Sequence, residues 1–218
     1  VLEKKLAEDG IMAIKRIENP QSSLDHAFNR LFEMVCYPII YKEQVKDLTL
    51  PQGILISGPP GVGKTHLVRR IAKSVNVPLI AIDGSEIFSP VQGESEENLR
   101  DLFEESYRAA STNIHRMAII FIDEIDTLAS KRSEDSGSTS VRFTTQLLTL
   151  IDGASRQRQS QNRIIIIGAT NRPNDVDSAM RRPGRFDREI IIEPPTVSER
   201  KALLESMMRV EGIDCAVI

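Results

Sequence analysis

Short apolar runs alternate along this chain with longer segments of helical periodicity. Five runs are rich in isoleucine, leucine or valine and are bounded by turn residues: 53–57 (GILIS), 78–83 (PLIAID), 117–123 (MAIIFID), 163–168 (RIIIIG) and 189–193 (EIIIE). Strands that are buried on both faces have this near-continuous apolar character, whereas half-exposed strands alternate. The pattern therefore predicts five strands of one buried sheet.

The segments between these runs carry apolar residues at helical spacing. A helix capped by Ser22 or Ser23 is predicted to end at Pro38, because proline disrupts the interior of a helix. Further helices are expected after the glycine-rich turn at 58–63, over 95–110 and 140–152, and from Ser198 onward. Because strands and helices alternate, we expect an α/β fold with a parallel sheet and right-handed crossovers.

The composition is that of a globular protein without a strong charge bias. Hydrophobic residues make up 40%, and 28 Lys and Arg against 31 Asp and Glu give a net charge of −3. These values exclude a disordered or fibrous chain and provide no basic field for nucleic acid. No apolar run reaches the ~20 residues of a membrane-spanning helix. Cys36 and Cys215 form no CxxC pair and indicate free thiols in a reducing compartment, which favours the cytoplasm, the nucleus or both.

The glycine-rich turn carries the clearest chemical signal. Residues 58–65 read GPPGVGKT and fit the pattern G-x-x-x-x-G-K-[ST] between a strand and a helix. Its glycines let backbone N–H groups point at phosphate oxygens, and the helix N-terminus adds partial positive charge. We expect Lys64 to reach the β- and γ-phosphates and the Thr65 hydroxyl to ligate Mg²⁺. The residues expected to bind the nucleotide are Gly58, Pro59, Pro60, Gly61, Val62, Gly63, Lys64, Thr65 and His66.

Two acidic residues end the third apolar run, which reads IIFIDE over 119–124. A buried strand would deliver Asp123 to the carboxyl edge of the sheet, where it can hold Mg²⁺, and Glu124 could polarise an attacking water. Acids that merely decorate a helix N-terminus are the structural alternative. The phosphate-loop motif earlier in the chain favours the catalytic interpretation, with hydrolysis rather than binding alone.

Two further motifs leave a structural and a catalytic interpretation open. Asn171, in GATNRP, could hydrogen-bond the γ-phosphate and the lytic water, or form a turn before Pro173. The segment 181–188, RRPGRFDR, holds four arginines. It is either a solvated basic turn or the source of a guanidinium that enters a neighbouring subunit's nucleotide site.

Taken in this order, GPPGVGKT, IIFIDEID, GATNRP and RRPGRFDRE resemble the AAA+ ATPases, specifically their classical AAA branch. GESEENLR (93–100) and QLLTLIDG (146–153) fit the same branch, and NRPNDVDSAMRRPGRFDRE is most similar to the first-ring modules of valosin-containing-protein-type unfoldases. The resemblance covers about residues 20–210. It implies the three-layer P-loop NTPase fold of the large AAA+ subdomain, with a five-stranded parallel sheet in the order 5-1-4-3-2. It also implies a hexamer with nucleotide sites between subunits.

The resemblance further implies a role for each motif. Asn171 becomes the first sensor, between the phosphate loop and the two acids, and Arg182 and Arg185 become fingers that act on a neighbour's nucleotide. ATP is then the substrate and Mg²⁺ the cofactor. The expected catalytic residues are Lys64, Glu124, Asn171, Arg182 and Arg185, and the expected metal ligands are Thr65 and Asp123.

Two segments depart from the family pattern. Pro20–Ser23 (PQSS) stands where Asp-Ile-Gly-Gly is usual beside adenine, and Pro90–Gly93 (PVQG) lacks an aromatic residue in the expected pore loop. These departures put tight base recognition and a strong grip on substrate in doubt. We divide the chain into a lead-in (1–19), a nucleotide-binding subdomain (20–197) and the start of a truncated helical lid (198–218), because about four lid helices do not fit after residue 193.

The sequence therefore predicts an ATP-hydrolysing module of a protein-remodelling machine, hexameric in the full-length protein. Its client would be a protein or a ribonucleoprotein, and no membrane is involved. The alternatives are a scaffold ring that binds ATP without hydrolysing it, and a nucleic-acid motor. Lys64, Glu124 and Asn171 argue against the scaffold, and the net charge of −3 argues against direct nucleic-acid binding.

Overall fold

A five-stranded parallel sheet lies at the centre of the computed structural model, which describes residues 17, 20, 22–41, 52–87, 93–128, 138–156 and 162–210. Its strands run in the order β2-β3-β4-β1-β5, and every neighbouring pair is parallel. This order confirms the expected 5-1-4-3-2 arrangement, counted from the opposite edge. The strands are β1 (Gly53–Ser57), β2 (Leu79–Asp83), β3 (Met117–Asp123), β4 (Arg163–Thr170) and β5 (Arg188–Ile191).

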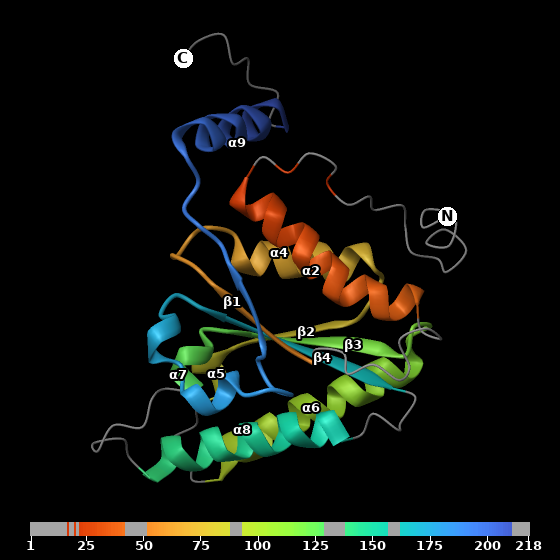
Figure 1. Ribbon diagram of the computed structural model, residues 1–218. Helices are drawn as coiled ribbons and strands as arrows, with labels where there is room; N and C mark the ends of the chain where they lie inside the picture. The colour runs from red at the N-terminus through yellow and green to blue at the C-terminus, as the bar shows by residue number, and fades with distance from the viewer. Residues whose placement is uncertain are drawn as a thin grey trace.

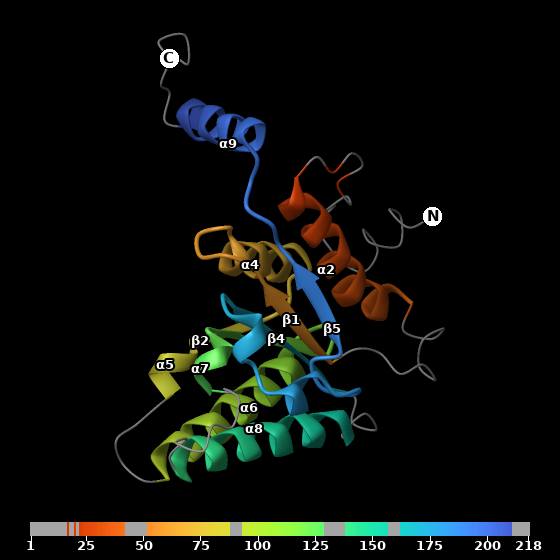
Figure 2. The ribbon, with the colours of Figure 1, turned by 60° about the vertical axis from the view of Figure 1, so that its left-hand side comes forward.

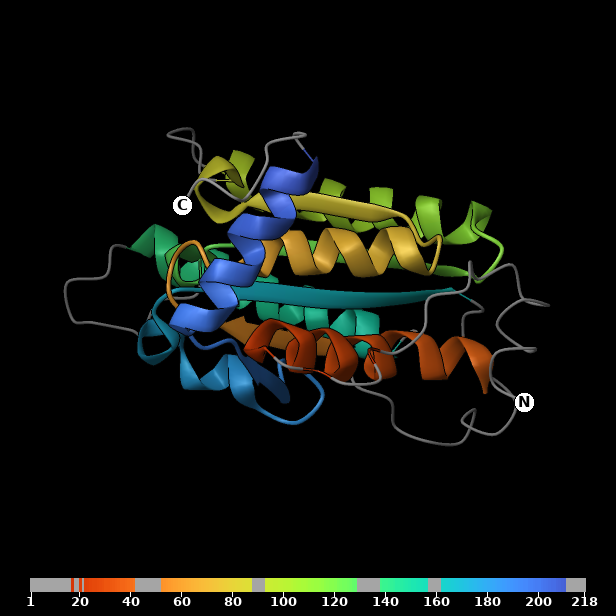
Figure 3. The same cartoon turned by 90° about the horizontal axis from the view of Figure 1, so that it is seen from above.

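Helices cover both faces of the sheet and make the fold three-layered (Figure 1). Helices α2 (Ser23–Ile40) and α4 (Lys64–Ser74) lie side by side over one face, as Figure 3 shows. Helices α6 (Glu94–Thr112) and α8 (Ser138–Arg156) cover the other. Successive strand side chains point to opposite faces, so Phe121 packs with the α2–α4 core and Ile122 with the α6–α8 core.

Helix α2 begins where the sequence predicts and ends later. The Ser22 hydroxyl accepts a 3.0 Å hydrogen bond from the Asp25 N–H, and the Asp25 carboxylate accepts one of 3.3 Å from the Ser22 N–H, forming a capping box. The prediction that Pro38 ends this helix was wrong, because α2 continues to Ile40 with the proline inside. The hydrogen bond from the Tyr41 N–H to the Tyr37 carbonyl, 2.9 Å long, closes the last turn despite the missing proline N–H.

Several other boundaries differ from the predicted ones. Strand β4 runs two residues past Gly168, because Ala169 and Thr170 pair with the last two residues of β1. Strand β5 stops before Ile192. Four short elements were not predicted: α5 (Gly84–Ile87), α7 (Ile125–Leu128) and the 3-10 turns η2 (Pro173–Asp175) and η3 (Ser178–Arg181). Three of the four follow the carboxyl ends of β2, β3 and β4, and η3 follows η2, so they shape the edge where the site lies.

Helix α9 (Val197–Val210) extends from the end of β5 and stands away from the sheet, beyond α2 and α4 (Figures 1 and 2). It begins one residue before the predicted start at Ser198, and its Leu203 and Leu204 are 58% and 59% exposed. Within the described ranges, no helix is both long enough and apolar enough to cross a membrane. Cys215, most of the lead-in and the pore-loop residues 90–92 lie outside the described residues.

Candidate active site

The phosphate loop connects β1, which ends at Ser57, to α4, which begins at Lys64. Gly63 is the N-cap of α4 with a φ of 95°, and Gly61 has a φ of 79°, conformations that glycine adopts without the strain a Cβ would add. No side chain caps the helix. The first N–H groups of α4 therefore keep their hydrogen-bonding capacity, and the positive end of the helix faces the loop. Together they make a site for anionic phosphate.

Lys64 joins the phosphate loop to the end of β4. Its Nζ donates to the carbonyl oxygens of Gly58 and Pro59, both at 2.8 Å, and to Oδ1 of Asn171 at 2.5 Å. Burial of this side chain lowers the pKa of Lys64 below its ordinary value, while nearby carboxylates, led by Asp123, oppose the shift. The Asn171 amide thus lies beside the lysine that the motif assigns to the phosphates.

Thr65 and Asp123 come together from α4 and β3. The Thr65 hydroxyl donates a 2.6 Å hydrogen bond to Oδ2 of Asp123. Hydroxyl and carboxylate oxygens are ligands that Mg²⁺ accepts, and in phosphate sites the ion completes its shell with phosphate oxygens and water. These two side chains therefore fit the expected cofactor, and they would hold it at the carboxyl edge of the sheet.

Glu124 occupies a turn between β3 and α7. It is exposed, and its φ of 49° is unusual for a residue with a side chain. The Glu124 carbonyl accepts hydrogen bonds from the N–H and the hydroxyl of Thr127, at 2.9 and 2.8 Å. Gly84 makes room for this turn, since a Cβ there would lie 2.8 Å from the Glu124 carbonyl oxygen. The backbone of Glu124 is therefore held in a defined conformation directly after Asp123.

A contact that sequence reasoning missed supports the Asn171 turn. The Thr170 hydroxyl donates to Oδ1 of Asp126 at 2.6 Å and accepts from the Arg172 N–H at 2.9 Å. These bonds flank Asn171 on both sides and tie the end of β4 to α7. The polar positions in IDEID and GATN were the available signal, but nothing in either motif shows that they meet.

The four arginines of segment 181–188 have different environments. Arg181 donates to Glu189 at 2.7 Å and to the Pro173 carbonyl at 2.6 Å. Arg185 pairs with Asp152 and is only 16% exposed. Arg182 and Arg188 are exposed, and the Arg182 side chain makes no hydrogen bond or ion pair with the described part of the chain. The segment is therefore a partly anchored turn rather than a uniformly solvated one.

The start of α2 lies next to the phosphate loop. The Leu24 side chain would be 3.6 Å from a Cβ placed on Gly63, and the Ser23 hydroxyl accepts a 2.8 Å hydrogen bond from the Glu193 N–H. The family resemblance places the segment Pro20–Ser23 beside adenine, and Leu24, the next residue after it, lies near the loop.

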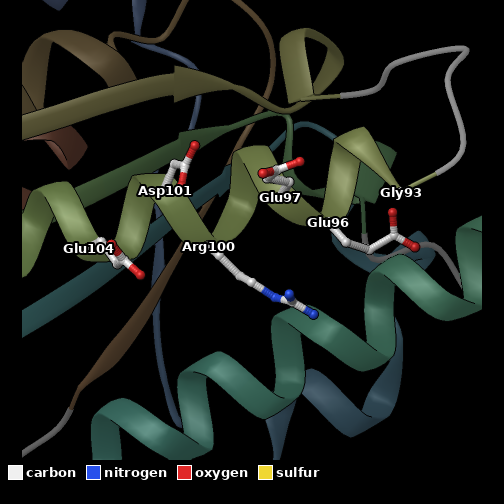
Figure 4. A pocket seen from close by; sticks show the side chains of 6 residues that line it. All are labelled: Gly93, Glu96, Glu97, Arg100, Asp101 and Glu104. Carbon is white, nitrogen blue, oxygen red and sulfur yellow. The ribbon is translucent and has the colours of Figure 1, made fainter.

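A separate groove of about 590 Å³ lies along α6 (Figure 4). In that view Arg100 points toward α8, whereas Glu97 and Asp101 point away from it. The residues that line the groove are Gly93, Glu96, Glu97, Arg100, Asp101 and Glu104, none of them a predicted site residue. Its acidic lining is unsuited to phosphate and sets it apart from the nucleotide site.

A parallel sheet whose carboxyl edge holds a glycine-rich loop, its lysine and threonine, and a strand-end aspartate defines a P-loop nucleotide-binding protein. A family model, "ATPase family associated with various cellular activities (AAA)", matches residues 54–194. The chain therefore belongs to the AAA family of ATPases, as the sequence motifs predict.

Similar proteins include members from archaea and animals. Protein SAV of Sulfolobus acidocaldarius is 44% identical over 184 residues, which cover 84% of this chain and 22% of that protein. The cell division cycle protein 48 homolog of Archaeoglobus fulgidus is 45% identical over 175 residues, covering 79% and 22%. The human ATPase family gene 2 protein homolog B is 40% identical over 190 residues, covering 86% and 24%. The chain thus spans less than a quarter of the length of these relatives.

Proposed function

We propose that this chain is the ATP-hydrolysing module of a protein-remodelling machine that works as a hexameric ring. The observation that carries the proposal is the meeting of two pairs at one edge of the sheet: Lys64 with Asn171 through a hydrogen bond of 2.5 Å, and Thr65 with Asp123 through one of 2.6 Å. A simple nucleotide-binding scaffold needs the loop and its lysine. It does not need an asparagine beside that lysine, or an acid held in a fixed turn after the metal-binding aspartate.

In this proposal each residue acts on ATP in a distinct way. Lys64 binds the β- and γ-phosphates, exchanging its loop carbonyls for phosphate oxygens. Thr65 and Asp123 hold Mg²⁺, which supplies positive charge against the phosphates. Glu124 accepts the proton of the attacking water as a general base. Asn171 orients that water and the γ-phosphate.

Arg182 and Arg185 are proposed to act in trans on the nucleotide of the next subunit. A guanidinium supplied by a neighbour stabilises the negative charge of the transition state and contributes about 10³–10⁵ in rate in phosphoryl-transfer enzymes. The exposure of Arg182 and the fixed position of Arg185 support this role. An assembly of several copies follows from it, because each site is then completed by another copy, and the resemblance to the classical AAA branch implies that this assembly is a hexamer.

The client is proposed to be a protein or a ribonucleoprotein, in the cytoplasm, the nucleus or both. Support comes from the AAA family membership and from the similarity to the cell division cycle protein 48 homolog. The domain division at residues 19 and 197 and a loose fit to adenine at Pro20–Ser23 belong to the same proposal.

Two substitutions in the full-length protein test hydrolysis. Glu124→Gln keeps the shape of the side chain but removes the base, so ATP should bind while turnover falls by ~10²–10⁴. Lys64→Ala should weaken ATP binding itself, because the ammonium contacts phosphate in the ground state. Glu104→Gln, in an exposed ion pair with Arg108 on α6, is the matched control and should change neither quantity. Wild-type turnover by Glu124→Gln would refute the proposed base.

A further inference from the structure

Arg185 is held against α8 by an ion pair in which both partners use two atoms. Its Nε donates to Oδ1 of Asp152 and its Nη2 donates to Oδ2, each at 2.8 Å. Its Nη1 donates to the Ala179 carbonyl at 2.7 Å. Such a paired contact fixes the plane of the guanidinium as well as its place, which a single hydrogen bond does not do.

These contacts leave part of the guanidinium available. Arginine carries five N–H donors, and Nη1 and Nη2 each bear two of them. Asp152 and Ala179 take the Nε–H and one donor from each Nη, so each Nη keeps another N–H. The edge that remains can still bind phosphate oxygens.

The backbone of Arg185 is fixed as firmly as its side chain. Gly53 at the start of β1 packs against it so closely that a Cβ there would meet the Arg185 carbonyl oxygen. The N–H of the next residue, Phe186, donates to the Met180 carbonyl at 2.9 Å, and its ring is buried. Both ends of the side chain therefore have a defined position.

Asp152 itself lies on an anchored part of α8. The Gln52 side chain donates a buried 3.1 Å hydrogen bond to the Ala154 carbonyl, which ties the last turn of α8 to the start of β1. Arg182 shows the contrast, because it is exposed on the same turn and has no such partner in the described part of the chain.

We propose that Asp152 is a positioning residue for trans hydrolysis: it orients the Arg185 guanidinium so that its unpaired N–H edge faces the nucleotide of the neighbouring subunit. This inference rests on the proposed function. An arginine that is already oriented loses less side-chain freedom on reaching the transition state, and small misplacements of catalytic groups are costly in rate.

The first test is a double-mutant cycle in the full-length hexameric protein, with kcat and KM for ATP as readouts. Asp152→Asn should lower kcat by about ten- to a hundred-fold, as expected for a misplaced catalytic group. KM should stay within about threefold of the wild type, because the subunit's own phosphate loop is untouched. Arg185→Ala should lower kcat further than Asp152→Asn does. The double variant should have the same kcat as Arg185→Ala alone. Glu104→Gln is the control ion-pair variant and should match the wild type.

Mixed rings separate positioning from a general loss of structure. Wild-type subunits are combined either with Glu124→Gln subunits or with subunits that carry Glu124→Gln and Asp152→Asn together. The second mixture should turn over more slowly, because the added change acts on the site of a wild-type neighbour. Equal rates in the two mixtures would overturn the role of Asp152.

The outcomes also distinguish this inference from the proposed function. If Arg185→Ala lowers kcat while Asp152→Asn does not, the positioning role is wrong and trans catalysis stands. If Arg185→Ala leaves kcat unchanged, the proposed action of Arg185 fails first, and the role of Asp152 fails with it.

Discussion

The Thr65 hydroxyl and the Asp123 carboxylate are joined by a hydrogen bond of 2.6 Å between the first turn of α4 and the end of β3. The two side chains come from segments that are far apart in the sequence and meet because their strands end at the same edge of the sheet. Both oxygens can ligate Mg²⁺ when the proton of the hydroxyl turns away. The contact thus brings together the two side chains that we propose as metal ligands.

Replacing the hydroxyl tests this arrangement. Thr65→Val keeps the size of the side chain and removes one metal ligand, so ATP affinity in the presence of Mg²⁺ should fall about ten- to a hundred-fold, the range seen when a metal site loses a partner. Affinity in the presence of a chelator should change little. Calorimetric titrations with and without Mg²⁺ measure both values. Thr149→Val, at an exposed hydroxyl on α8, is the control.

Asn171 should matter for the transition state more than for ATP binding. Asn171→Ala leaves Lys64 with its two loop carbonyls. We expect kcat to fall about a hundred-fold, as for loss of one stabilising donor, with ATP affinity nearly unchanged. Steady-state kinetics decide the point, since a higher KM with an unchanged kcat would show that Asn171 serves ground-state binding only.

Two glycines should respond to alanine in opposite directions. A Cβ on Gly53 would lie 2.6 Å from the Arg185 carbonyl carbon, and backbone cannot yield as a flexible side chain can. Gly53→Ala should therefore lower the free energy of unfolding by about 1–3 kcal/mol. Gly153 lies in α8 with open space around it, so Gly153→Ala should raise the free energy of unfolding by about 0.5–1 kcal/mol. Denaturant unfolding of both variants measures the sign of each change in the free energy of unfolding. A Gly53→Ala protein as stable as the wild type would contradict the close packing of Gly53 against the Arg185 backbone.

Cys36 should be unreactive in the folded protein. Burial raises the pKa of the Cys36 thiol from its ordinary value of 9.0 to about 12, so the nucleophilic thiolate is scarce at pH 8. In a Cys215→Ser background, a thiol reagent should modify Cys36 only after denaturant is added. Rapid modification of the native protein would contradict its burial.

The same shift has a consequence for stability at high pH. Between pH 9 and 12 the folded state keeps a proton that the unfolded state has lost, so the free energy of unfolding falls as the pH rises. The contribution of the Cys36 thiol to the free energy of unfolding is complete below pH 9. It falls by about 1.4 kcal/mol per pH unit above that pH. Other groups titrate in this range, so the Cys36→Ala variant is the reference. The difference in the free energy of unfolding between the wild type and Cys36→Ala should shrink between pH 8 and 10. A constant difference would contradict the raised pKa of Cys36.

Much of the fold could be predicted because local pattern and long-range packing agree. The isoleucine run at 163–168 is apolar enough to be a buried strand in any context, and the alternation with helices limits the topology. The strand order, however, came from the family resemblance, since no local rule places β1 between β4 and β5. Pro38 shows where a local rule fails, because α2 continues for two residues beyond the proline and the Tyr41 N–H still bonds to the Tyr37 carbonyl.

The motifs and the family resemblance predicted that Lys64, Thr65, Asp123 and Asn171 lie near one another, but not how these side chains are held. Lys64 and Thr65 follow from the loop pattern, since the spacing itself fixes their place at the start of α4. The Asp152–Arg185 pair could not be foreseen, because both residues are ordinary in their own segments and meet only through the packing of α8 on the sheet. The left-handed conformation of Glu124 also depends on its surroundings, in particular on the space left by Gly84.

The position of β1 between β4 and β5 has a consequence for how the protein folds during synthesis. Both of its partners, β4 and β5, lie beyond residue 160. Pairing over such long separations is slow, because much chain entropy is lost before the contacts form. A ribosome must therefore release most of this chain before β1 has neighbours on either side. The phosphate loop, although it is made early, is expected to be among the last parts to take its final shape, so nucleotide binding would mark the completion of folding rather than its beginning.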